Sequence, residues 1–281
     1  MKPVFNLRKA VESRYSVRTY SSKTMLPELK TQLLNYAGTI ENPFGAEVRL
    51  QFVEKELAPN GEKLGTYGII KGTNSYLGVT VAEAEFALEG LGYSFEQFVL
   101  YAASLGLGTC WLGGTFNKSA FAQAMDIREG EVFPILSPIG YPAEKKSLTE
   151  KIMRTAVKAG ERLPGEKIFF SESFEKPVSR GEAGEYNYAF EMLRLAPSAV
   201  NKQPWRVVAD GDSIHFFKKH SDTAENLGLD MQRIDMGIAM AHFDLAMQEQ
   251  GTEGCFEKLP VSIDVPQGLK YIISWKKLKI Y

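Results

Sequence analysis

The sequence contains little cysteine, little histidine and almost no net charge. Its 281 residues include 2 cysteines and 3 histidines, and 33 lysines and arginines nearly balance 34 acidic residues, for a net charge of -1. Two cysteines without partners at zinc or iron–sulfur spacing argue against a disulfide scaffold and favour a reducing, cytoplasmic location. Proteins that bind the phosphate backbone carry a basic excess, so nucleic acid is not expected as a partner.

Long apolar runs are also missing. No segment approaches the roughly 18 apolar residues of a membrane span, and the first residues lack the apolar core of a secretory signal. We therefore expect no membrane partner. The composition, 44% hydrophobic and 24% charged, is that of an ordinary globular protein. Because domains usually contain about 100 to 200 residues, the length allows one large domain or two small ones.

The first half of the chain combines helical and strand patterns. Apolar residues recur at helical spacing in some segments and alternate in others. The predicted helices cover residues 7–14, 27–37 and a buried segment that ends at Gly106, and the predicted strands cover residues 47–55, 75–82 and 132–139. A polar, lysine-rich stretch over residues 143–158 follows.

The second half repeats this order. Helices are predicted over residues 188–195 and 238–247, and strands over 205–209 and 214–218. A shift of 145 positions places four residues of the first half on identical residues of the second: Gly106 on Gly251, Cys110 on Cys255, Phe98 on Phe243 and Leu100 on Leu245. We interpret this as a diverged duplication with halves at residues 1–160 and 161–281. The alternative is a chance match between two amphipathic helices.

Two arginines flank a serine in the first motif, Arg14-Tyr15-Ser16-Val17-Arg18. If this segment is helical, Arg14 and Arg18 share one face. A guanidinium group grips phosphate oxygens through two donors, and the Ser16 hydroxyl supplies another. The motif is thus a candidate phosphate site, and the alternative is a pair of arginines on a solvated helix face.

The second motif is a glycine-rich turn, Leu105 to Gly114, that follows the buried helix. Glycine lets a backbone approach a flat ligand closely, and exposed N–H groups on such a turn can bond to a nitrogen or carbonyl of that ligand. The alternative is a helix C-cap before a tight turn. It is not a dinucleotide fingerprint, because that motif lies between a strand and the start of a helix.

The third motif is a loop bracketed by Pro197 and Pro204 just before a predicted strand. Such a rigid loop can present the Ser198 hydroxyl and the Asn201 amide at fixed geometry. The alternative is a plain connector, since proline and serine favour turns. A fourth segment, which contains Arg162, says little by itself.

Together these segments resemble the FMN-dependent nitroreductase family. The matching pieces are Arg-x-Ser-x-Arg, Gly-Leu-Gly-x-x-Trp-x-Gly-Gly, Arg-Leu-Pro and Pro-Ser-x-x-Asn-x-Gln-Pro-Trp. In most members two chains pair so that each flavin touches both, whereas here the motifs are divided between two halves of one chain. This resembles the duplicated, single-chain branch named TM nitroreductases. The resemblance implies an α+β, nitroreductase-like fold, with helices on mixed and antiparallel sheets, whose halves form a pseudo-dimer that acts as a monomer.

The resemblance also assigns cofactor-binding residues, all to a single FMN. The phosphate and ribityl end would be bound by Arg14, Ser16, Arg18 and Arg162. The ring system would be bordered by Pro197, Ser198, Ala199 and Asn201. Backbone N–H groups of Gly113 and Gly114 would face flavin N5, and Lys71 would stabilise the anionic reduced flavin at its N1 and O2 edge.

Each half departs from the family pattern at one motif. The first half reads Thr39 to Gly45 where its own Pro-Ser loop is expected, and the second reads Gly251 to Phe256 where its Gly-Gly turn is expected. The second, pseudo-symmetric flavin site, to which these two segments would contribute, is therefore expected to be inactive. This predicts one FMN per chain.

The implied activity is that of an FMN-dependent NAD(P)H oxidoreductase. NADH or NADPH would reduce flavin N5, and a small-molecule electron acceptor such as a nitroaromatic or a quinone would then be reduced in a ping-pong cycle. No catalytic side chain is required, because the flavin performs the redox chemistry. The alternatives are a specialised flavoenzyme of the same fold and a non-catalytic flavin-binding or flavin-storage protein.

Metal catalysis is not expected. The three histidines, His215, His220 and His242, do not form a ligand constellation, and His242 lies on a predicted apolar helix, where a hydrogen-bonded core histidine is the better interpretation. Cys110 has no histidine nearby in sequence and is interpreted as a small buried thiol.

Overall fold

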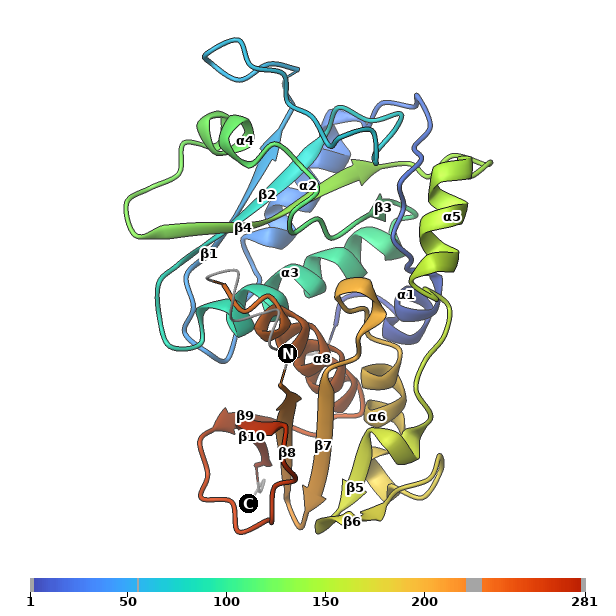
Figure 1. The fold of residues 1–281 in the computed structure, drawn as a ribbon, viewed down its shortest axis with the longest axis vertical. Coiled ribbons are helices and arrows are strands. Elements are labelled where there is room, and N and C mark those ends of the chain that lie inside the picture. Colours follow the sequence, from blue (N-terminus) through green and yellow to red (C-terminus); the bar gives the residue numbers. More distant parts are fainter. Residues whose placement is uncertain (1–2, 55, 221–228, 279–281) are drawn as a thin grey trace. The chain divides into compact units, whose positions relative to one another are not determined.

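The structure is a computed structural model, and it describes residues 3–54, 56–220 and 229–278. It consists of two compact units (Figure 1). The N-terminal unit is Lys9–Gly160, and the C-terminal unit is Glu161–Tyr281 together with Met1–Arg8. Helix α1 (Leu7–Ser13) contains the division.

The N-terminal unit is built on a four-stranded antiparallel sheet in the order β1-β2-β4-β3. Helix α3 is buried along most of its length, as expected for a helix that is apolar on nearly all sides. The strands are β1 (Val48–Val53), β2 (Tyr76–Ala82), β3 (Gly108–Thr109) and β4 (Glu131–Gly140), and the remaining helices are α2 (Pro27–Ala37), α3 (Ala87–Ser104), α4 (Lys118–Met125) and α5 (Leu148–Ala156).

The C-terminal unit contains a six-stranded mixed sheet in the order β6-β5-β7-β8-β10-β9, in which only the β5–β7 pair is parallel. In the core, Phe243 packs edge-to-face against Phe216 and Trp275, with ring centroids 5.7 and 5.3 Å apart. The elements are β5 (Phe169–Ser171), β6 (Ser173–Pro177), α6 (Asn187–Arg194), β7 (Trp205–Asp210), β8 (Ser213–Lys219), α8 (Gln232–Glu249), β9 (Gly254–Glu257) and β10 (Leu269–Lys277), with single 3-10 turns at Gly165–Lys167, Gly184–Tyr186 and Ala199–Asn201.

The two sheets share one topology, which confirms the tandem halves. The order β7-β8-β10-β9 repeats β1-β2-β4-β3. Helices α3 and α8 both contain 18 residues, and α8 begins at Gln232, 145 positions after Ala87. Phe98 and Phe243, paired by the sequence shift, are both fully buried.

The predicted start of one helix was wrong, because α8 begins six residues before residue 238. The segment from Arg14 to Tyr20 is not helical, since α1 ends at Ser13, so the condition for Arg14 and Arg18 to share a helix face is not met. The lysine-rich stretch, to which no element was assigned, contains helix α5, with Ser147 as a side-chain cap. Residue 55, at the end of the strand predicted for 47–55, lies outside the described residues.

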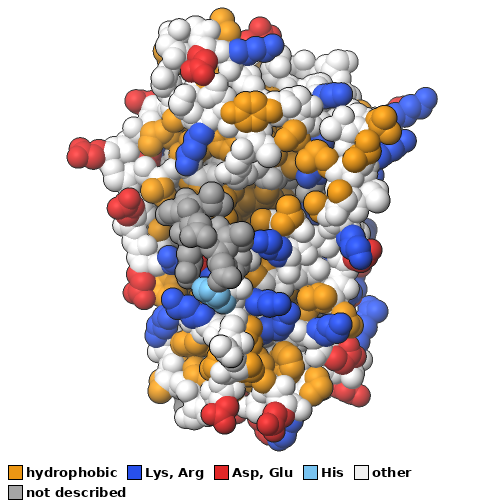
Figure 2. Space-filling view, viewed as in Figure 1, with side chains coloured by type: hydrophobic (Ala, Val, Ile, Leu, Met, Phe, Trp, Pro, Cys, Tyr) orange, Lys and Arg blue, Asp and Glu red, His pale blue; other side chains and the backbone are white. Residues whose placement is uncertain are grey.

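The surface carries charges of both signs. Figure 2 shows acidic and basic side chains on the same face of the molecule, as the near-neutral net charge leads one to expect. Within the residues that the structure describes, no helix is both long enough and apolar enough to cross a membrane.

Candidate functional site

The Arg-Ser-Arg motif lies in an extended segment of the N-terminal unit. The Val17 N–H donates to the Thr109 carbonyl at 2.9 Å, and the Tyr20 N–H donates to the Lys71 carbonyl at 2.8 Å. The segment therefore runs between the glycine-rich turn and the stretch that contains Lys71. These hydrogen bonds place the Arg-Ser-Arg motif beside both the glycine-rich turn and Lys71, which are far apart in sequence.

The backbone of the motif is extended rather than helical. Alternate residues of an extended chain lie on one face, so Arg14, Ser16 and Arg18 point the same way, whereas a helix would turn Ser16 aside. All three influence the Cys110 thiol, whose pKa burial raises while Arg18, Ser16 and Arg14 lower it in part. The three donors are thus gathered on one side without the helix that would have placed Arg14 and Arg18 on one face.

Both arginines have buried donor atoms without acceptors. Arg14 Nε and Arg18 Nε are buried and have no hydrogen-bond partner in the described part of the chain. Arg14 Nε lies 3.9 Å from Glu96 Oε1, beyond hydrogen-bond distance, and burial lowers the Arg14 pKa while Glu96 raises it. Buried donors without acceptors are rare in native proteins. The pair fits the oxygens of a phosphate monoester, which is the terminal group of FMN.

Helix α5 adds a carboxylate that the sequence analysis missed. Glu150 is 1% exposed, and its Oε2 accepts the Arg18 N–H at 3.3 Å. The local signal was the pattern Ser-x-x-Glu, since Ser147 Oγ accepts the Glu150 N–H at 3.2 Å and starts the helix. No sequence pattern indicated that this glutamate turns toward Arg18.

Two further cations gather beside the motif. Lys146 Nζ lies 4.5 Å and Arg154 Cζ lies 5.3 Å from the centre of the Tyr15 ring. Burial raises the pKa of Tyr15, and Glu150 raises it further. Tyr15 thus serves as an aromatic platform that holds basic side chains near the proposed phosphate donors.

The Gly-Gly turn presents unpaired backbone donors. Leu112 exchanges two backbone hydrogen bonds with Leu136 of β4, at 2.9 and 3.0 Å, and fixes the start of the turn. Gly113 and Gly114 are exposed in a bend, and within the described residues their N–H groups have no hydrogen-bond partner.

The corresponding position of the second half is occupied differently. The 145-residue shift places Lys258 and Leu259 on the two glycines, and the Leu259 N–H already donates to the Tyr271 hydroxyl at 3.0 Å. In the first half, Asn42 of the loop from Thr39 to Gly45 uses its amide on the loop itself and donates to the Ala46 carbonyl at 2.8 Å. The Asn42 amide and the Leu259 N–H therefore already have hydrogen-bond partners within their own half.

The Pro-Ser loop, Pro197 to Pro204, lies in the C-terminal unit before β7. Ser198 Oγ accepts the Gln203 N–H at 2.8 Å, which closes the loop on itself. The Ala199 N–H donates to Asp235 Oδ1 at 2.9 Å. The loop is thus anchored to α8 at one of the predicted site residues.

Arg162 joins this loop. Its Nη1 donates to Asn201 Oδ1 at 3.1 Å, and Asn201 Nδ2 donates to the Glu161 carbonyl at 3.0 Å. The predicted site residues therefore form two groups, each within one unit. The first group is Arg14, Ser16, Arg18, Lys71, Gly113 and Gly114, and the second is Arg162, Pro197, Ser198, Ala199 and Asn201.

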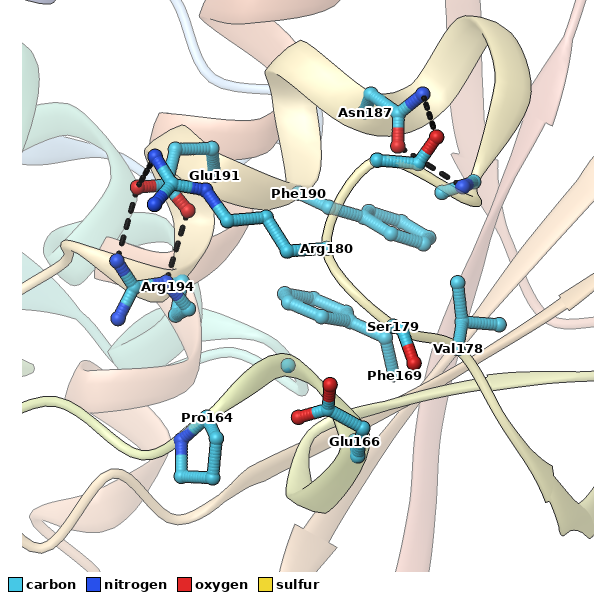
Figure 3. Close-up of a pocket in the computed structure, with 13 residues that line it drawn as sticks. Pro164, Glu166, Phe169, Val178, Ser179, Arg180, Asn187, Phe190, Glu191 and Arg194 are labelled. Carbon is cyan, nitrogen blue, oxygen red and sulfur yellow. Dashed lines mark hydrogen bonds and ion pairs between the residues drawn. The ribbon is translucent and has the colours of Figure 1, made fainter.

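A cavity of about 280 Å³ also lies within the C-terminal unit (Figure 3). Its arginines already have a shared partner, because Glu191 pairs with Arg194 at 2.8 Å and with Arg180 at 3.3 Å. Phe169 and Phe190 stack beside it with centroids 4.3 Å apart. Of the motif residues only Pro164, from the Arg-Leu-Pro segment, lines the cavity, and both lining arginines are already paired with Glu191, so we do not assign the flavin to it.

Two histidines, His215 and His242, are hydrogen-bonded inside the C-terminal unit. His215 Nδ1 lies 2.6 Å from Ser274 Oγ, and His242 Nδ1 lies 2.9 Å from the Met192 carbonyl, as expected for a satisfied core histidine. Burial lowers the pKa of His215. In the described ranges, no three histidine, cysteine, aspartate or glutamate side chains gather in a way that could hold a metal ion.

Comparison with known proteins places the chain in a family. The family model described as "Putative TM nitroreductase" matches residues 6–247. The chain belongs to this family. A nitroreductase structure from Thermotoga maritima is 20% identical, covers 96% of this chain and 93% of its own, and has a TM-score of 0.60. At this identity it shows the fold, which is the nitroreductase-like α+β fold expected from the motifs.

Other solved nitroreductases match about half of the chain. One from Bacteroides thetaiotaomicron is 17% identical over 50% of this chain and 89% of its own, with a TM-score of 0.41. One from Exiguobacterium sibiricum, solved in complex with FMN, is 16% identical over 54% and 98%, with a TM-score of 0.40. No curated protein matches the chain in sequence.

Proposed function

We propose that this chain binds one FMN and is an NAD(P)H oxidoreductase that reduces small acceptors such as nitroaromatics or quinones. The observation that carries the proposal is the pair of buried Nε donors of Arg14 and Arg18, on either side of Ser16, that have no hydrogen-bond acceptor among the described residues. Membership of a nitroreductase family supports it. We further propose that the protein works as a monomer.

In this proposal Arg14, Ser16 and Arg18 hold the FMN phosphate. The N–H groups of Gly113 and Gly114, which have no partner in the part of the chain that the structure describes, are suited to the flavin N5, and the exposed Lys71 to the N1 and O2 edge. Bound FMN would supply hydride transfer.

The contribution of the second half stays a prediction from the sequence. It assigns Arg162 to the phosphate end and the Pro-Ser loop residues Pro197, Ser198, Ala199 and Asn201 to the ring system of the same flavin. The hydrogen bond between Arg162 and Asn201 supports treating them as one functional group.

The test is anaerobic reduction of the reconstituted protein. After incubation with FMN and removal of the excess, the protein is mixed with NADH or NADPH in a stopped-flow instrument. We expect at least one nicotinamide to bleach the bound flavin and a quinone to restore its colour. A protein that retains FMN but is bleached by neither nicotinamide would contradict the reductase activity and leave flavin binding intact.

A further inference from the structure

The Pro-Ser loop holds a backbone conformation that its residues rarely adopt. Val200, Asn201 and Gln203 have φ values of 45°, 57° and 47°, in the left-handed region. This region is uncommon for any residue with a Cβ and is a clear outlier for the β-branched Val200. Such conformations persist only where surrounding contacts fix them. The groups that anchor the loop therefore decide whether its shape survives.

Asp235, on the first turn of α8, is one of these anchors. Its side chain is 4% exposed, and its Oδ1 accepts the Ala199 N–H at 2.9 Å. Its second oxygen, Oδ2, is buried and has no hydrogen-bond partner among the described residues. An ionised carboxylate in this position would bury a charge with one oxygen unsatisfied, which is costly.

A second unsatisfied acceptor lies three residues earlier on the same helix. Gln232 is 7% exposed, and its Oε1 is also buried without a partner in the described part of the chain. Side chains three positions apart on a helix are neighbours. A single proton on Asp235 Oδ2 that is donated to Gln232 Oε1 would satisfy both oxygens, whereas ionised Asp235 would leave both without a donor.

The charged groups around Asp235 do not neutralise it. Burial raises the pKa of Asp235 to about 7, the Ala199 N–H opposes this shift, Asp230 adds to it and Lys202 lowers it in part. Asp230 is itself paired with Lys218 of β8. The balance favours the neutral carboxyl up to neutral pH.

We propose that Asp235 is a positioning residue that holds the Pro-Ser loop while protonated, with its proton donated to Gln232, and that its ionisation loosens the loop. The effect on flavin binding rests on the proposed function, because it requires that this loop contact FMN. The state of Asp235 itself does not depend on flavin.

The variants are chosen to separate the proton from the charge. Asp235→Asn keeps an oxygen for the Ala199 N–H and offers an amide donor to Gln232, so it imitates the protonated carboxyl. Asp235→Ala removes both bonds. Asp264→Asn, at an exposed aspartate of the same unit, is the matched control.

The first measurement is thermal unfolding of the protein without flavin between about pH 4 and pH 8. A carboxyl whose folded-state pKa lies above its unfolded value of 3.8 stabilises the fold fully only below that value. Its contribution is then lost as pH rises toward 7. We expect the melting temperature of the wild type to fall across this window relative to Asp235→Asn, and Asp264→Asn to follow the wild type. Parallel curves for the wild type and Asp235→Asn would overturn the proposal.

The second measurement is FMN affinity from the quenching of flavin fluorescence at about pH 6 and pH 8. At the lower pH, Asp235→Asn should bind like the wild type, and Asp235→Ala should bind more weakly. Above neutral pH the wild type should weaken relative to Asp235→Asn, by at most about tenfold per pH unit for one coupled proton. Equal weakening by both substitutions at low pH would overturn the proposal. If no variant binds FMN, the proposed function fails, while the unfolding curves still decide the state of Asp235.

Discussion

Arg162 Nη1 donates a hydrogen bond to Asn201 Oδ1 at 3.1 Å, although the two residues come from different sequence motifs 39 positions apart. The Arg162 Nε also donates to the Leu195 carbonyl at 3.3 Å, so the guanidinium group bridges the end of α6 and the Pro-Ser loop. Because Asn201 has a left-handed backbone, this bond helps to hold a conformation that the chain would otherwise avoid.

The first prediction is that Arg162 and Asn201 act as a unit. Asn201→Gly removes the amide at a position where glycine accepts the positive φ, and Arg162→Ala removes the donor. In a double-mutant cycle on the free energy of unfolding, measured by urea titration, we expect a coupling of about 0.5–3 kcal/mol. Effects that add within about 0.5 kcal/mol would contradict the coupling.

The second prediction concerns stoichiometry. In the proposed N5 turn the N–H groups of Gly113 and Gly114 have no partner among the described residues, whereas the aligned Leu259 N–H is already bonded. We therefore expect one flavin per chain in the reconstituted protein, measured as flavin absorbance against protein concentration from amino-acid analysis. A ratio near two would show that the second half retains a working site.

The third prediction tests the close approach of Lys71 to the motif. A Cβ on Gly72, which has φ +88°, would lie 2.1 Å from the Tyr20 carbonyl oxygen, while a Cβ on Gly130, at φ +78°, meets nothing within 4 Å. Gly130→Ala therefore measures the cost of positive φ alone, about 1 kcal/mol. Gly72→Ala should destabilise the protein by a further 1–3 kcal/mol or so, read from urea unfolding. Equal costs would mean that the two segments are not packed as described.

The fourth prediction concerns acid stability. Arg49 Nε and Nη2 donate to the two carboxylate oxygens of Glu131, at 2.9 and 2.5 Å. These hydrogen bonds and the charge of Arg49 lower the pKa of Glu131 from 4.5 to about 2. Because the folded pKa lies below the unfolded one, this stabilisation is present above pH 4.5 and is lost as pH falls toward 2. Glu131→Gln should flatten the fall in melting temperature over this range. The exposed Glu129→Gln should leave it unchanged.

Much of the fold could be predicted from the sequence. The helix over 27–37 was predicted to the residue, and the 145-residue shift matches the start of α8 relative to α3. These successes come from strong apolar periodicity, which local sequence carries. Strand β10 was not predicted, although Leu269, Tyr271, Ile273 and Trp275 recur at every second position in it. Its pairing with β8 and β9 is set by residues distant in sequence.

The candidate site was predicted in parts. The residue types were visible in the motifs, but the extended backbone of Arg14 to Arg18 was not, since its shape is set by pairing with Thr109 and Lys71. Glu150 and Asp235 were missed for the same reason. Each is an ordinary helix carboxylate in sequence, and only the fold brings Glu150 to Arg18 and Asp235 to Ala199.

The central claim is that Arg14, Ser16 and Arg18 hold the phosphate of FMN, and the most direct test compares FMN with riboflavin, which lacks that phosphate. Equilibrium titrations of flavin fluorescence would be run on the wild type, Arg14→Gln, Arg18→Gln and the exposed control Arg128→Gln. Two charge-assisted bonds of about 1.5–3 kcal/mol each predict that FMN binds at least about 100-fold more tightly than riboflavin. Each site substitution should remove much of this preference, and the control should keep it. Equal affinity of the wild type for FMN and riboflavin would contradict the account.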